Sequence, residues 1–593
     1  MESIVATNPV HSAVSNVYAL IAGERWSEAA VLLERVLPQI PEWKEGPLLL
    51  AQANYHRGRL AEAFQGLRTA IGQGATNPGV FLLLGHVLRK AGHFADAADA
   101  YEACLQLSPE HVTALIALGN LAREQRQTRR AREYFERALR MRPEDPNILN
   151  NLAAVLCDVG RTRESIDLLE HALRANPAAH ETGSNLLLTL HYDSTMPPER
   201  LAAAHRSWAA QHAASIPRLA LDVDRNPGRR LRVGFLSADF KNHPVGRLME
   251  ALWPRLDRSV MEVLAFDAGT SADAVTAGLH GFTEAWHSLA GLSDESTAML
   301  IQRDRVDILV DLSGHTAGNR LLVFARKPAP IQITWFAYPN TTALAAMDYR
   351  ISDGLADPAG TVEARYAERL LRFREIAWQY RPPITDLEVQ PLPHTRGRPF
   401  TFGCLNNPAK VSEATLRLWA EILRRCPASR LLLLVRDDDE SIATLHRRWM
   451  EAGLRPDQLV CVHSAPPRQF LAYHYEVDLI LDPFPYNGAV TTADALWMGV
   501  PVLTLAGDSY VSRQGVAVLS QLGLQEWIAG SAAEYVQKAV AATVDPTPLA
   551  TLNRELRVRL ERSPLMDHDR FAREFESRMR EVWRSGCAAA DAA

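Results

Sequence analysis

Positions 34 residues apart in the first third of this chain repeatedly carry the same kind of residue. Small residues recur in two series, Gly85, Gly119 and Ala153, and Ala63, Ala97, Ala131 and Ser165. Bulky residues recur at Tyr101, Phe135 and Leu169, and prolines recur at Pro109, Pro143 and Pro177. A single period held by several independent residue classes predicts a stack of equal structural units.

Each unit of this length has room for two helices. The small residues allow the helices to approach closely, and each proline ends the second helix because it has no N–H to donate. This is the tetratricopeptide pattern, and Ala29, Val36 and Ala51 extend it backward, so we predict five units from about residue 9 to 178. Such arrays stack into a superhelix whose concave face binds extended polypeptide. The front of the chain is therefore expected to bind a protein or peptide.

Composition excludes several classes of partner. The 593 residues are 47% hydrophobic and 22% charged, which is enough for a repeat domain and two globular lobes. A net charge of −5 without clusters gives no reason to expect nucleic acid or a membrane surface as a partner. Six scattered cysteines without a CxxC pair predict reduced thiols. The start of the chain lacks a signal-peptide layout, and a cytoplasmic location is expected.

The pattern changes after a polar connector that contains DVDRNPGRR. Short β-rich runs alternate with helical stretches in two sets, which predicts two doubly wound lobes with parallel sheets. A segment rich in proline and polar residues, 381–400, is interpreted as the hinge between them. The predicted parts are a repeat superhelix (1–215), a linker (216–230), an N-terminal lobe (231–388), a C-terminal lobe (389–566), and a C-terminal helix to about residue 584 with a disordered tail (567–593).

Polar and basic residues follow the first strand of the second lobe. The string FGCLNNPAKVSEATL places Asn406, Asn407 and Lys410 directly after that strand, with Ser412 opening a helix. In open α/β sheets, ligands bind beyond the carboxyl ends of the strands. A lysine at this place can therefore reach an anionic ligand, and the helix N-terminus adds favourable potential.

A second motif in the same lobe, LDPFPYNGAVTTADALWMGVP, suits a diphosphate. Gly488 lies in a turn, Thr491 and Thr492 begin a helix, and Asp494 falls in its first turn. Hydroxyls and free N–H groups there can bind phosphate, and the carboxylate can take ribose hydroxyls. Turns and threonine caps are common in any fold, but the two motifs together favour a nucleoside diphosphate over simple capping.

The first lobe contributes two histidines that follow strands, His243 and His315, and both are expected to face the cleft. A neutral imidazole there could take the proton of an attacking hydroxyl, although a surface histidine that only makes hydrogen bonds is an equal alternative for His243. The acidic run at 437–440 is interpreted as a solvated turn, because it has no spaced partner ligand. No metal is expected, since Lys410 and a helix N-terminus can neutralise a leaving diphosphate.

Several strings resemble one family of enzymes. FKNHPVGRLME, PAPIQITWFAYPNTT, MDYRISDGLADP, CLNNPAKV and YNGAVTTADALWMGVP, together with the repeats, are similar to the O-GlcNAc transferase and Spindly family of glycosyltransferases, and closely to its bacterial members. The resemblance covers nearly the whole chain. It implies an all-α repeat superhelix followed by a GT-B region of two Rossmann-like lobes. It also implies inverting, metal-independent transfer of GlcNAc from UDP-GlcNAc to Ser or Thr hydroxyls of proteins, with no cofactor besides the donor.

The resemblance also implies roles for individual residues. Lys410 matches the lysine that contacts the diphosphate and stabilises its departure, and Asn407 aligns with a glutamine at the same phosphates. His243 matches an active-site histidine beside the sugar, which was once proposed as the base and is now often regarded as a positioning group. The other residues expected at the site are His315 as a catalytic candidate and Pro339, Ala465, Phe470, Tyr486, Thr491, Thr492 and Asp494 as substrate-binding residues.

Departures from the animal enzymes concern the donor. Ala489 and Val490 replace a His-Thr pair next to the phosphates, and Phe470 replaces a histidine that stacks on uracil while keeping a stacking face. Tyr486 replaces a small cysteine near the N-acetyl pocket. The strings YPNTT and FPYxG are also similar to Spindly proteins, whose donor is GDP-fucose. Two alternatives therefore remain open: protein O-fucosyl transfer from GDP-fucose, and a nucleotide-binding repeat scaffold without turnover.

Overall fold

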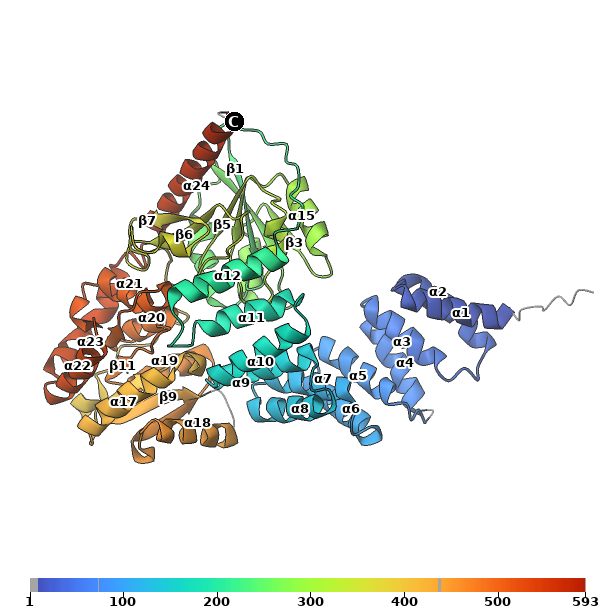
Figure 1. The fold of residues 1–593 in the computed structure, drawn as a ribbon, viewed down its shortest axis with the longest axis horizontal. Helices are drawn as coiled ribbons and strands as arrows, with labels where there is room; N and C mark the ends of the chain where they lie inside the picture. The colour runs from blue at the N-terminus through green and yellow to red at the C-terminus, as the bar shows by residue number, and fades with distance from the viewer. Residues whose placement is uncertain (1–8, 73, 436–438, 592–593) are drawn as a thin grey trace, which may run out of the picture. The chain divides into compact units, whose positions relative to one another are not determined.

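The computed structural model describes residues 9–72, 74–435 and 439–591 of the chain (Figure 1). Residues 1–8, 73, 436–438 and 592–593 lie outside this description. The chain divides into two compact units, Met1–Val155 and Leu156–Ala593, each with its own internal packing.

The first unit consists of pairs of antiparallel helices. They are α1 (Pro9–Ala22), α2 (Trp26–Val36), α3 (Gly46–His56), α4 (Leu60–Gly72), α5 (Pro78–Lys90), α6 (Phe94–Leu107), α7 (Val112–Glu124), α8 (Thr128–Met141) and the greater part of α9 (Pro146–Asp158). A Cβ at Gly85 of α5 would lie 2.3 Å from the Tyr101 ring of α6, and one at Gly119 of α7 would lie 2.6 Å from the Phe135 ring of α8. The bulky residue of each second helix thus requires the small residue of the first, which confirms the tetratricopeptide prediction.

The second unit begins with further repeat helices, which are α10 (Thr162–Ala175), α11 (His180–Leu190) and α12 (Pro198–His212). The repeat packing continues here, because a Cβ at Gly183 of α11 would lie 2.6 Å from the Trp208 ring of α12. The repeat superhelix predicted over 1–215 thus includes helices of both compact units, the first of which ends at Val155. The reason is that Leu187 and Trp208 belong to the same buried cluster as residues of the following α/β lobe.

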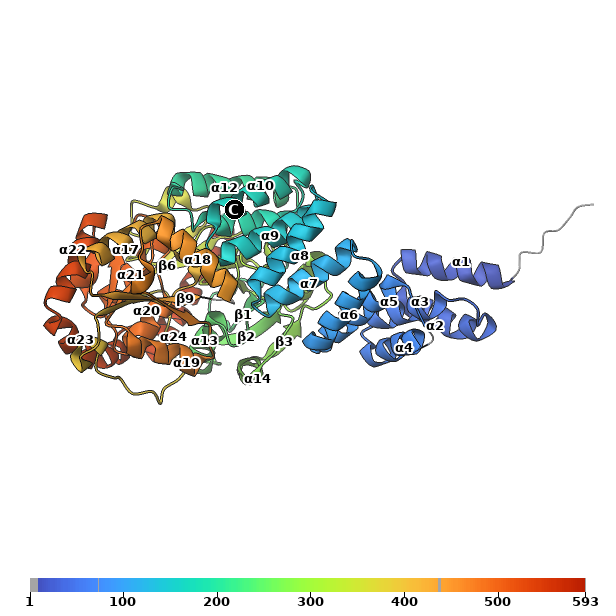
Figure 2. The same ribbon diagram turned by 90° about the horizontal axis from the view of Figure 1, so that it is seen from below.

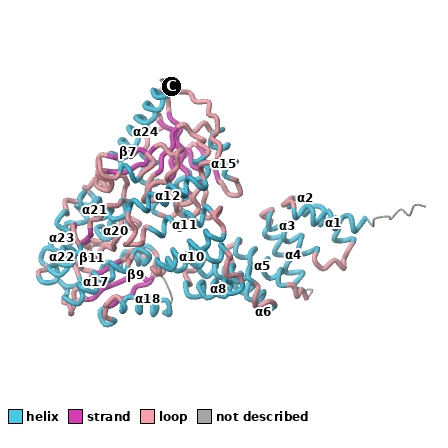
Figure 3. Tube along the Cα trace, in the orientation of Figure 1, coloured by secondary structure: helices cyan, strands magenta, loops and turns pink. Residues whose placement is uncertain are grey.

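Two parallel sheets form the rest of the second unit, and they are separate from one another (Figure 3). The first has the order β3-β2-β1-β4-β5-β6-β7 and the second β10-β9-β8-β11-β12-β13. The strands of the first sheet are β1 (Leu231–Ser237), β2 (Met261–Asp267), β3 (Ala285–Ser288), β4 (Ile308–Asp311), β5 (Ile331–Thr334), β6 (Tyr349–Asp353) and β7 (Arg369–Phe373). Those of the second are β8 (Thr401–Cys404), β9 (Arg430–Val435), β10 (Leu459–His463), β11 (Leu479–Leu481), β12 (Val502–Leu505) and β13 (Ile528–Ala529).

Helices cover both sheets, as expected for buried parallel strands. The N-terminal lobe has α13 (Pro244–Leu252), α14 (Ala274–His280), α15 (Asp294–Arg303) and α16 (Leu321–Ala325). The C-terminal lobe has α17 (Glu413–Arg425), α18 (Asp439–Glu451), α19 (Pro467–Ala472), α20 (Val490–Trp497), α21 (Gln514–Gln521), α22 (Ala532–Val544) and α23 (Thr547–Glu561), which surround its sheet (Figures 1 and 2). Two Rossmann-like lobes after a repeat array are the predicted GT-B architecture, which is thereby confirmed.

The last helix, α24 (His568–Asp591), returns to the N-terminal lobe. Phe571, Phe575 and Trp583 are buried in the core of that lobe. The predicted disordered tail is wrong for residues 585–591, because the helix continues through them and Cys587 is buried. Cys587 lies one turn after Trp583 on the same face, and the alanines that follow favour helix.

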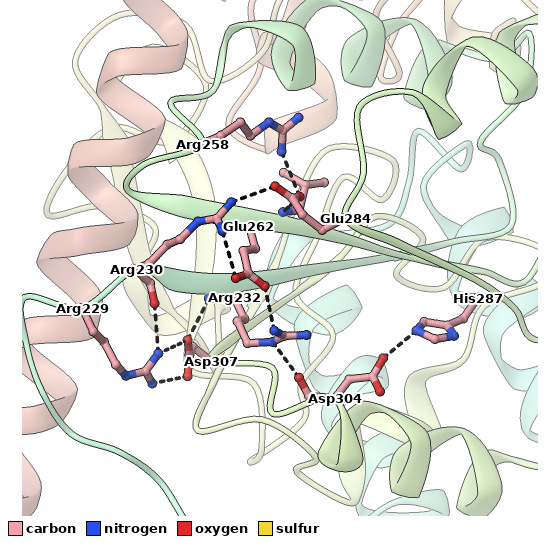
Figure 4. A network of polar contacts seen from close by, with 10 residues as sticks. Arg229, Arg230, Arg232, Arg258, Glu262, Glu284, His287, Asp304 and Asp307 are labelled. Carbon is pink, nitrogen blue, oxygen red and sulfur yellow. Dashed lines mark hydrogen bonds and ion pairs between the residues drawn. The ribbon is translucent and has the colours of Figure 1, made fainter.

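The connector before β1 is fastened by ion pairs (Figure 4). Arg229 forms a two-pronged pair with Asp307, just before β4, with Nη1 donating to Oδ2 at 2.6 Å. Its guanidinium also lies 4.7 Å from the centroid of the Trp583 ring. Arg232 of β1 pairs with Glu262 of β2 at 2.7 Å. These charges lie at the amino ends of the strands, so they fix the connector and α24 without occupying the ligand-binding edge.

The close approach in the repeats can be tested by adding one methyl group. Gly119→Ala is expected to cost about 1–3 kcal/mol, because the new Cβ overlaps the Phe135 ring. Thermal unfolding followed by circular dichroism measures this loss. Gly72→Ala is the control, since its Cβ meets nothing within 4 Å and the change is expected to be neutral or slightly stabilising. An equal loss in both variants contradicts the packing argument.

Candidate active site

The two polar motifs of the C-terminal lobe meet at Lys410. The lysine ends a short 3-10 turn, Pro408–Lys410, that follows β8. Its Nζ donates to the carbonyl of Asn487 at 2.9 Å and lies 4.3 Å from the centroid of the Tyr486 ring. Asn407 caps the turn, because its Oδ1 accepts the N–H of Ala409 at 3.2 Å. The fold thus places the lysine against the turn that was expected to bind a diphosphate.

A buried carboxylate balances this cation. Asp482 follows β11, is 1% exposed, and accepts the N–H of Gly488 and the hydroxyl of Thr504, both at 2.7 Å. Burial lowers the pKa of Lys410 to about 8, and the charge of Asp482 opposes that shift. Burial in turn raises the pKa of Asp482. Lys410 is therefore a cation at neutral pH, held in a site of low polarity where its charge acts strongly.

The start of α20 forms a small cradle of donors. Thr491 Oγ1 donates to Asn406 Oδ1 at 2.7 Å, while Thr492 Oγ1, in a residue that is 1% exposed, has no hydrogen-bond partner among the described residues. The N-cap residue, Ala489, offers no side-chain hydrogen bond to the helix. A Cβ at Gly488 would lie 2.6 Å from both threonine hydroxyl oxygens. An uncapped helix start with a spare hydroxyl and a glycine is suited to phosphate.

The predicted ribose ligand, Asp494, lies further along α20. It is 5% exposed, and its Oδ1 accepts the hydroxyl of Tyr380 at 2.7 Å. Burial raises the pKa of Asp494 to about 6, and the Tyr380 hydrogen bond opposes the shift. Tyr380 comes from the segment that joins the lobes, and its role was not predicted from the sequence. The WQYRPP string, with an aromatic residue two positions before the hinge prolines, was the available signal.

The predicted base-side residues lie beside β10. Ala465 follows that strand and Phe470 lies on α19, and both are half-buried. The Phe470 ring contacts the ring of His474 edge-on, at 5.9 Å between centroids. A cavity of about 390 Å³ opens nearby. It is lined by both lobes and by the segment between them, through Asn242, Arg247, Glu250, Arg381, Pro382 and Pro467 among others.

His243 is the N-cap of α13. Its Nδ1 accepts the N–H of Val245 at 3.3 Å, and Asp239 Oδ2 lies 3.8 Å from the same nitrogen. Burial lowers the pKa of His243, so the ring is neutral at pH 7. Because Nδ1 accepts a hydrogen bond, the proton of the neutral ring lies on Nε2. Nε2 can then donate a hydrogen bond, which fits a positioning group better than a base.

His315 does not face the cleft, contrary to the expectation. It is 0% exposed, and its Nδ1 lies 2.9 Å from the Ser184 hydroxyl of α11. Its ring packs edge-on against Trp208 of α12, at 4.5 Å between centroids. Burial lowers the pKa of His315 to about 3. The physical reason is that the last repeat helices cover the end of β4, which no local pattern in the sequence indicates.

The same helices bind the loop at residues 338–340. His205 Nε2 lies 2.6 Å from the Tyr338 hydroxyl, and His191 Nε2 lies 3.2 Å from Asn340 Nδ2. In both histidines Nδ1 faces the backbone carbonyl one turn back, at 2.7–2.8 Å. Nδ1 therefore donates in each ring and Nε2 accepts from the loop. Pro339, expected at the substrate site, is buried within this loop.

Tyr486 also contacts the repeat helices. The ring of Tyr192, which follows α11, stacks on the Tyr486 ring at 5.3 Å between centroids with an angle of 28° between their planes. Burial raises the pKa of Tyr486 to about 12. Neither contact of the repeat with the site, through His191 or through Tyr192, was predicted from the sequence. The string HYD after the last predicted repeat unit was the only local signal.

Among the described residues, no group of three or more His, Cys, Asp or Glu side chains is placed to hold a metal ion. The acidic run begins with Asp437 and Asp438, which lie outside the described residues. No disulfide joins any of the six cysteines, all of which lie among the described residues. Within the described chain, no helix is both long and apolar enough to span a membrane.

A repeat array joined to two Rossmann-like lobes, with a lysine and an uncapped helix start at one strand edge, defines a protein of the GT-B fold class. Comparison with known families agrees with this class. Residues 190–377 and 397–575 match Glycosyl transferase family 41, so the chain belongs to that family. Residues 82–146 and 116–180 match the Tetratricopeptide repeat family.

The relatives of this chain include proteins named SPINDLY and SEC. The Probable UDP-N-acetylglucosamine–peptide N-acetylglucosaminyltransferase SPINDLY of Oryza sativa subsp. japonica is 35% identical over 420 residues, 69% of this chain and 45% of the rice protein. The SEC protein of Arabidopsis thaliana, with the same activity in its name, is 30% identical over 388 residues, 63% of this chain and 39% of that protein. The chain thus spans less than half the length of these relatives.

A solved structure is similar over a larger share. The structure of a mutant of the Thermobaculum terrenum O-GlcNAc transferase is 33% identical, with a TM-score of 0.82, over 86% of this chain and 98% of that chain.

The histidine contacts predict a loss of stability in acid. Burial lowers the pKa of His191 from 6.5 to about 4, so between these values the unfolded chain binds a proton that the folded protein does not. The free energy of unfolding therefore falls as the pH falls through this window, by at most about 3 kcal/mol for this residue. His191→Gln removes the titrating group, and its melting temperature is expected to change less between pH 6.5 and 4.5. If the melting temperatures of the two proteins fall equally between pH 6.5 and 4.5, His191 is not the group that lowers stability in acid.

Proposed function

We propose that this protein transfers a sugar from a nucleoside diphosphate donor to hydroxyl groups of Ser or Thr in a protein, and that the donor is UDP-GlcNAc. The observation that carries the proposal is the contact of Lys410 with the Asn487 carbonyl beside the open start of α20. A half-buried cation and the free N–H groups at the helix start form a site for a dianionic leaving group. Membership of Glycosyl transferase family 41 supports a sugar as the transferred group.

In the proposed reaction, the acceptor oxygen attacks the anomeric carbon from the side opposite the diphosphate. The new bond to the acceptor forms as the bond to the diphosphate oxygen breaks, so the configuration inverts. The Lys410 ammonium and the Thr492 hydroxyl stabilise the charge that develops on the diphosphate. These groups supply the positive potential for which other glycosyl transfers use a cation, so we propose a metal-independent reaction without a cofactor.

The acceptor proton requires a destination other than His243. Because its Nδ1 caps α13, the His243 Nε2–H is a donor, and we assign it to positioning the sugar or the acceptor. His315 is buried against Ser184 and is not available. The proton then passes to a water chain or to the donor's own phosphate. The repeat superhelix binds the protein acceptor in this scheme, and neither nucleic acid nor a membrane takes part.

Fucosyl transfer from GDP-fucose is the second candidate. It is favoured by Tyr486, whose half-buried ring lies directly against Lys410 and leaves less room for an N-acetyl group. In either case Asp494 binds the ribose, Ala465 and Phe470 contact the base, and Asn407 lies beside the phosphates. The names of the relatives, which specify UDP-N-acetylglucosamine, support the first candidate.

Isothermal titration with UDP, UDP-GlcNAc, GDP and GDP-fucose tests the donor, and Lys410→Ala tests the site. We expect the uridine pair to bind, and the variant to bind it more weakly and to transfer sugar roughly 100-fold or more slowly with its fold intact. Lys538→Ala, on α22 of the same lobe, is the control and should behave as the wild type.

Preference for the guanosine pair moves the assignment to fucosyl transfer. Binding without turnover indicates a scaffold, and unchanged turnover in Lys410→Ala removes this lysine from the mechanism.

The rate of transfer is expected to depend on pH in a bell shape. Asp494, with a pKa of about 6, loses its charge in acid and with it the acceptor for ribose hydroxyls. Lys410, with a pKa of about 8, loses its charge in alkali and with it the stabilisation of the diphosphate. Initial rates at saturating acceptor between pH 5 and 10 measure both limbs. A plateau that extends to pH 10 would contradict the role of the lysine charge.

A further inference from the structure

The ring of Tyr486 lies between two parts of the molecule. On the catalytic side, the Lys410 ammonium lies 4.3 Å from its centroid. On the repeat side, the ring of Tyr192 stacks on it at 5.3 Å, and His191 contacts it edge-on at 6.5 Å. Tyr486 precedes the glycine-containing turn in a segment without regular structure, so these contacts help to fix its orientation.

The repeat side of this arrangement is itself fixed. His191, the neighbour of Tyr192, bonds to Asn340 of the N-terminal lobe through Nε2 and to the Leu187 carbonyl through Nδ1. The residue is 3% exposed. The backbone that carries Tyr192 is therefore anchored, and its ring is a fixed surface for Tyr486.

One of the contacts that hold Lys410, the contact with the Tyr486 ring, depends on the Tyr192 ring. Its hydrogen bond goes to the Asn487 carbonyl, and its other contact is the face of the Tyr486 ring. A cation over an aromatic face is attracted to it, most strongly away from water. If the Tyr486 ring tilts, the ammonium loses this attraction and its confinement towards the start of α20. If this cation–aromatic contact stabilises the transition state more than the bound donor, its loss lowers the rate roughly 10-fold.

We propose that Tyr192 is a positioning residue of the transfer reaction, acting through the Tyr486 ring to hold Lys410 against the leaving diphosphate. The inference rests on the proposed function of Lys410 and deepens it. It gives the repeat domain a part in the chemical step, in addition to the binding of an acceptor. The end of α11 is in this sense part of the catalytic region.

Hydrolysis of the donor separates this role from acceptor binding. Transfer of the sugar to water in the absence of peptide needs Lys410 but no acceptor contact. Tyr192→Leu removes the stacking ring and is expected to lower donor hydrolysis and peptide transfer by the same factor, roughly 10-fold, with the KM for peptide unchanged. Tyr192→Phe keeps the ring and should restore most of both rates. Tyr55→Leu, in α3 of the first unit, is the control and should leave hydrolysis unchanged.

Two results overturn the proposal: a loss of peptide transfer with normal hydrolysis, which assigns Tyr192 to the acceptor, and no loss of either. Circular dichroism checks the fold of each variant. If Tyr192→Leu does not fold, Tyr192→His, with a smaller ring, takes its place and is expected to give an intermediate loss of both rates.

A chemical measurement distinguishes failure of this inference from failure of the proposed function. Lys410 is acylated with an amine-reactive ester, and its labelling is compared with that of exposed Lys44 by mass spectrometry. In Tyr192→Leu, Lys410 is expected to be labelled several-fold faster than in the wild type, because the Tyr486 ring no longer shields the amine as well. In Tyr192→Phe the labelling rate is expected to equal that of the wild type. This readout requires no turnover. If the wild type hydrolyses no donor, the proposed function fails, and an unchanged labelling rate overturns the positioning role independently.

Discussion

The buried guanidinium of Arg350 joins three parts of the second unit. Its Nη1 donates to the carbonyls of Tyr338 and Asn340, at 3.0 and 2.8 Å, which fixes the loop that receives the histidines of α11 and α12. Its charge lies 4.8 Å from the centroid of the Tyr510 ring in the C-terminal lobe. An arginine stays charged when buried, so it needs such carbonyls and ring faces around it. The N-terminal lobe, the C-terminal lobe and the last repeat helices therefore share one anchoring point.

The proposed catalytic region carries two charged groups that are shielded from water, the half-buried Lys410 and the buried Asp482. Lys410 and Asp482 lie in a site where burial shifts both of their pKa values toward the neutral forms, and each charge opposes the shift of the other. A pair of this kind acts strongly on a bound diphosphate but is sensitive to small displacements. Contacts that confine Lys410, such as the Tyr486 ring, thus bear directly on the chemistry. The repeat helices contribute to this confinement through Tyr192.

The sequence predicted the elements of the site better than their surroundings. Lys410 and the start of α20 were found because both follow strands of one lobe, and parallel strands end at a common edge. His315 follows a strand as well, yet it is buried against Ser184, 131 positions away in the chain. Tyr380 and Tyr192 were missed for the same reason, since their partners are far away in the sequence. The length of α24 was underestimated because Cys587, beyond the predicted end of the helix, is buried in the core of the N-terminal lobe.

The sequence by itself determined the repeat period, the two α/β lobes and the strings that place the chain in its family. These features follow from local rules: a side chain's place along a helix or strand sets which face it joins, and glycine or proline sets where the element ends. Only the tertiary structure decided which of the two histidines is fully buried, which tyrosine contacts Lys410, and that the last repeat helices pack with the lobes. Those outcomes depend on which surface covers a given strand end, and that is fixed by packing between segments that lie far apart in the sequence.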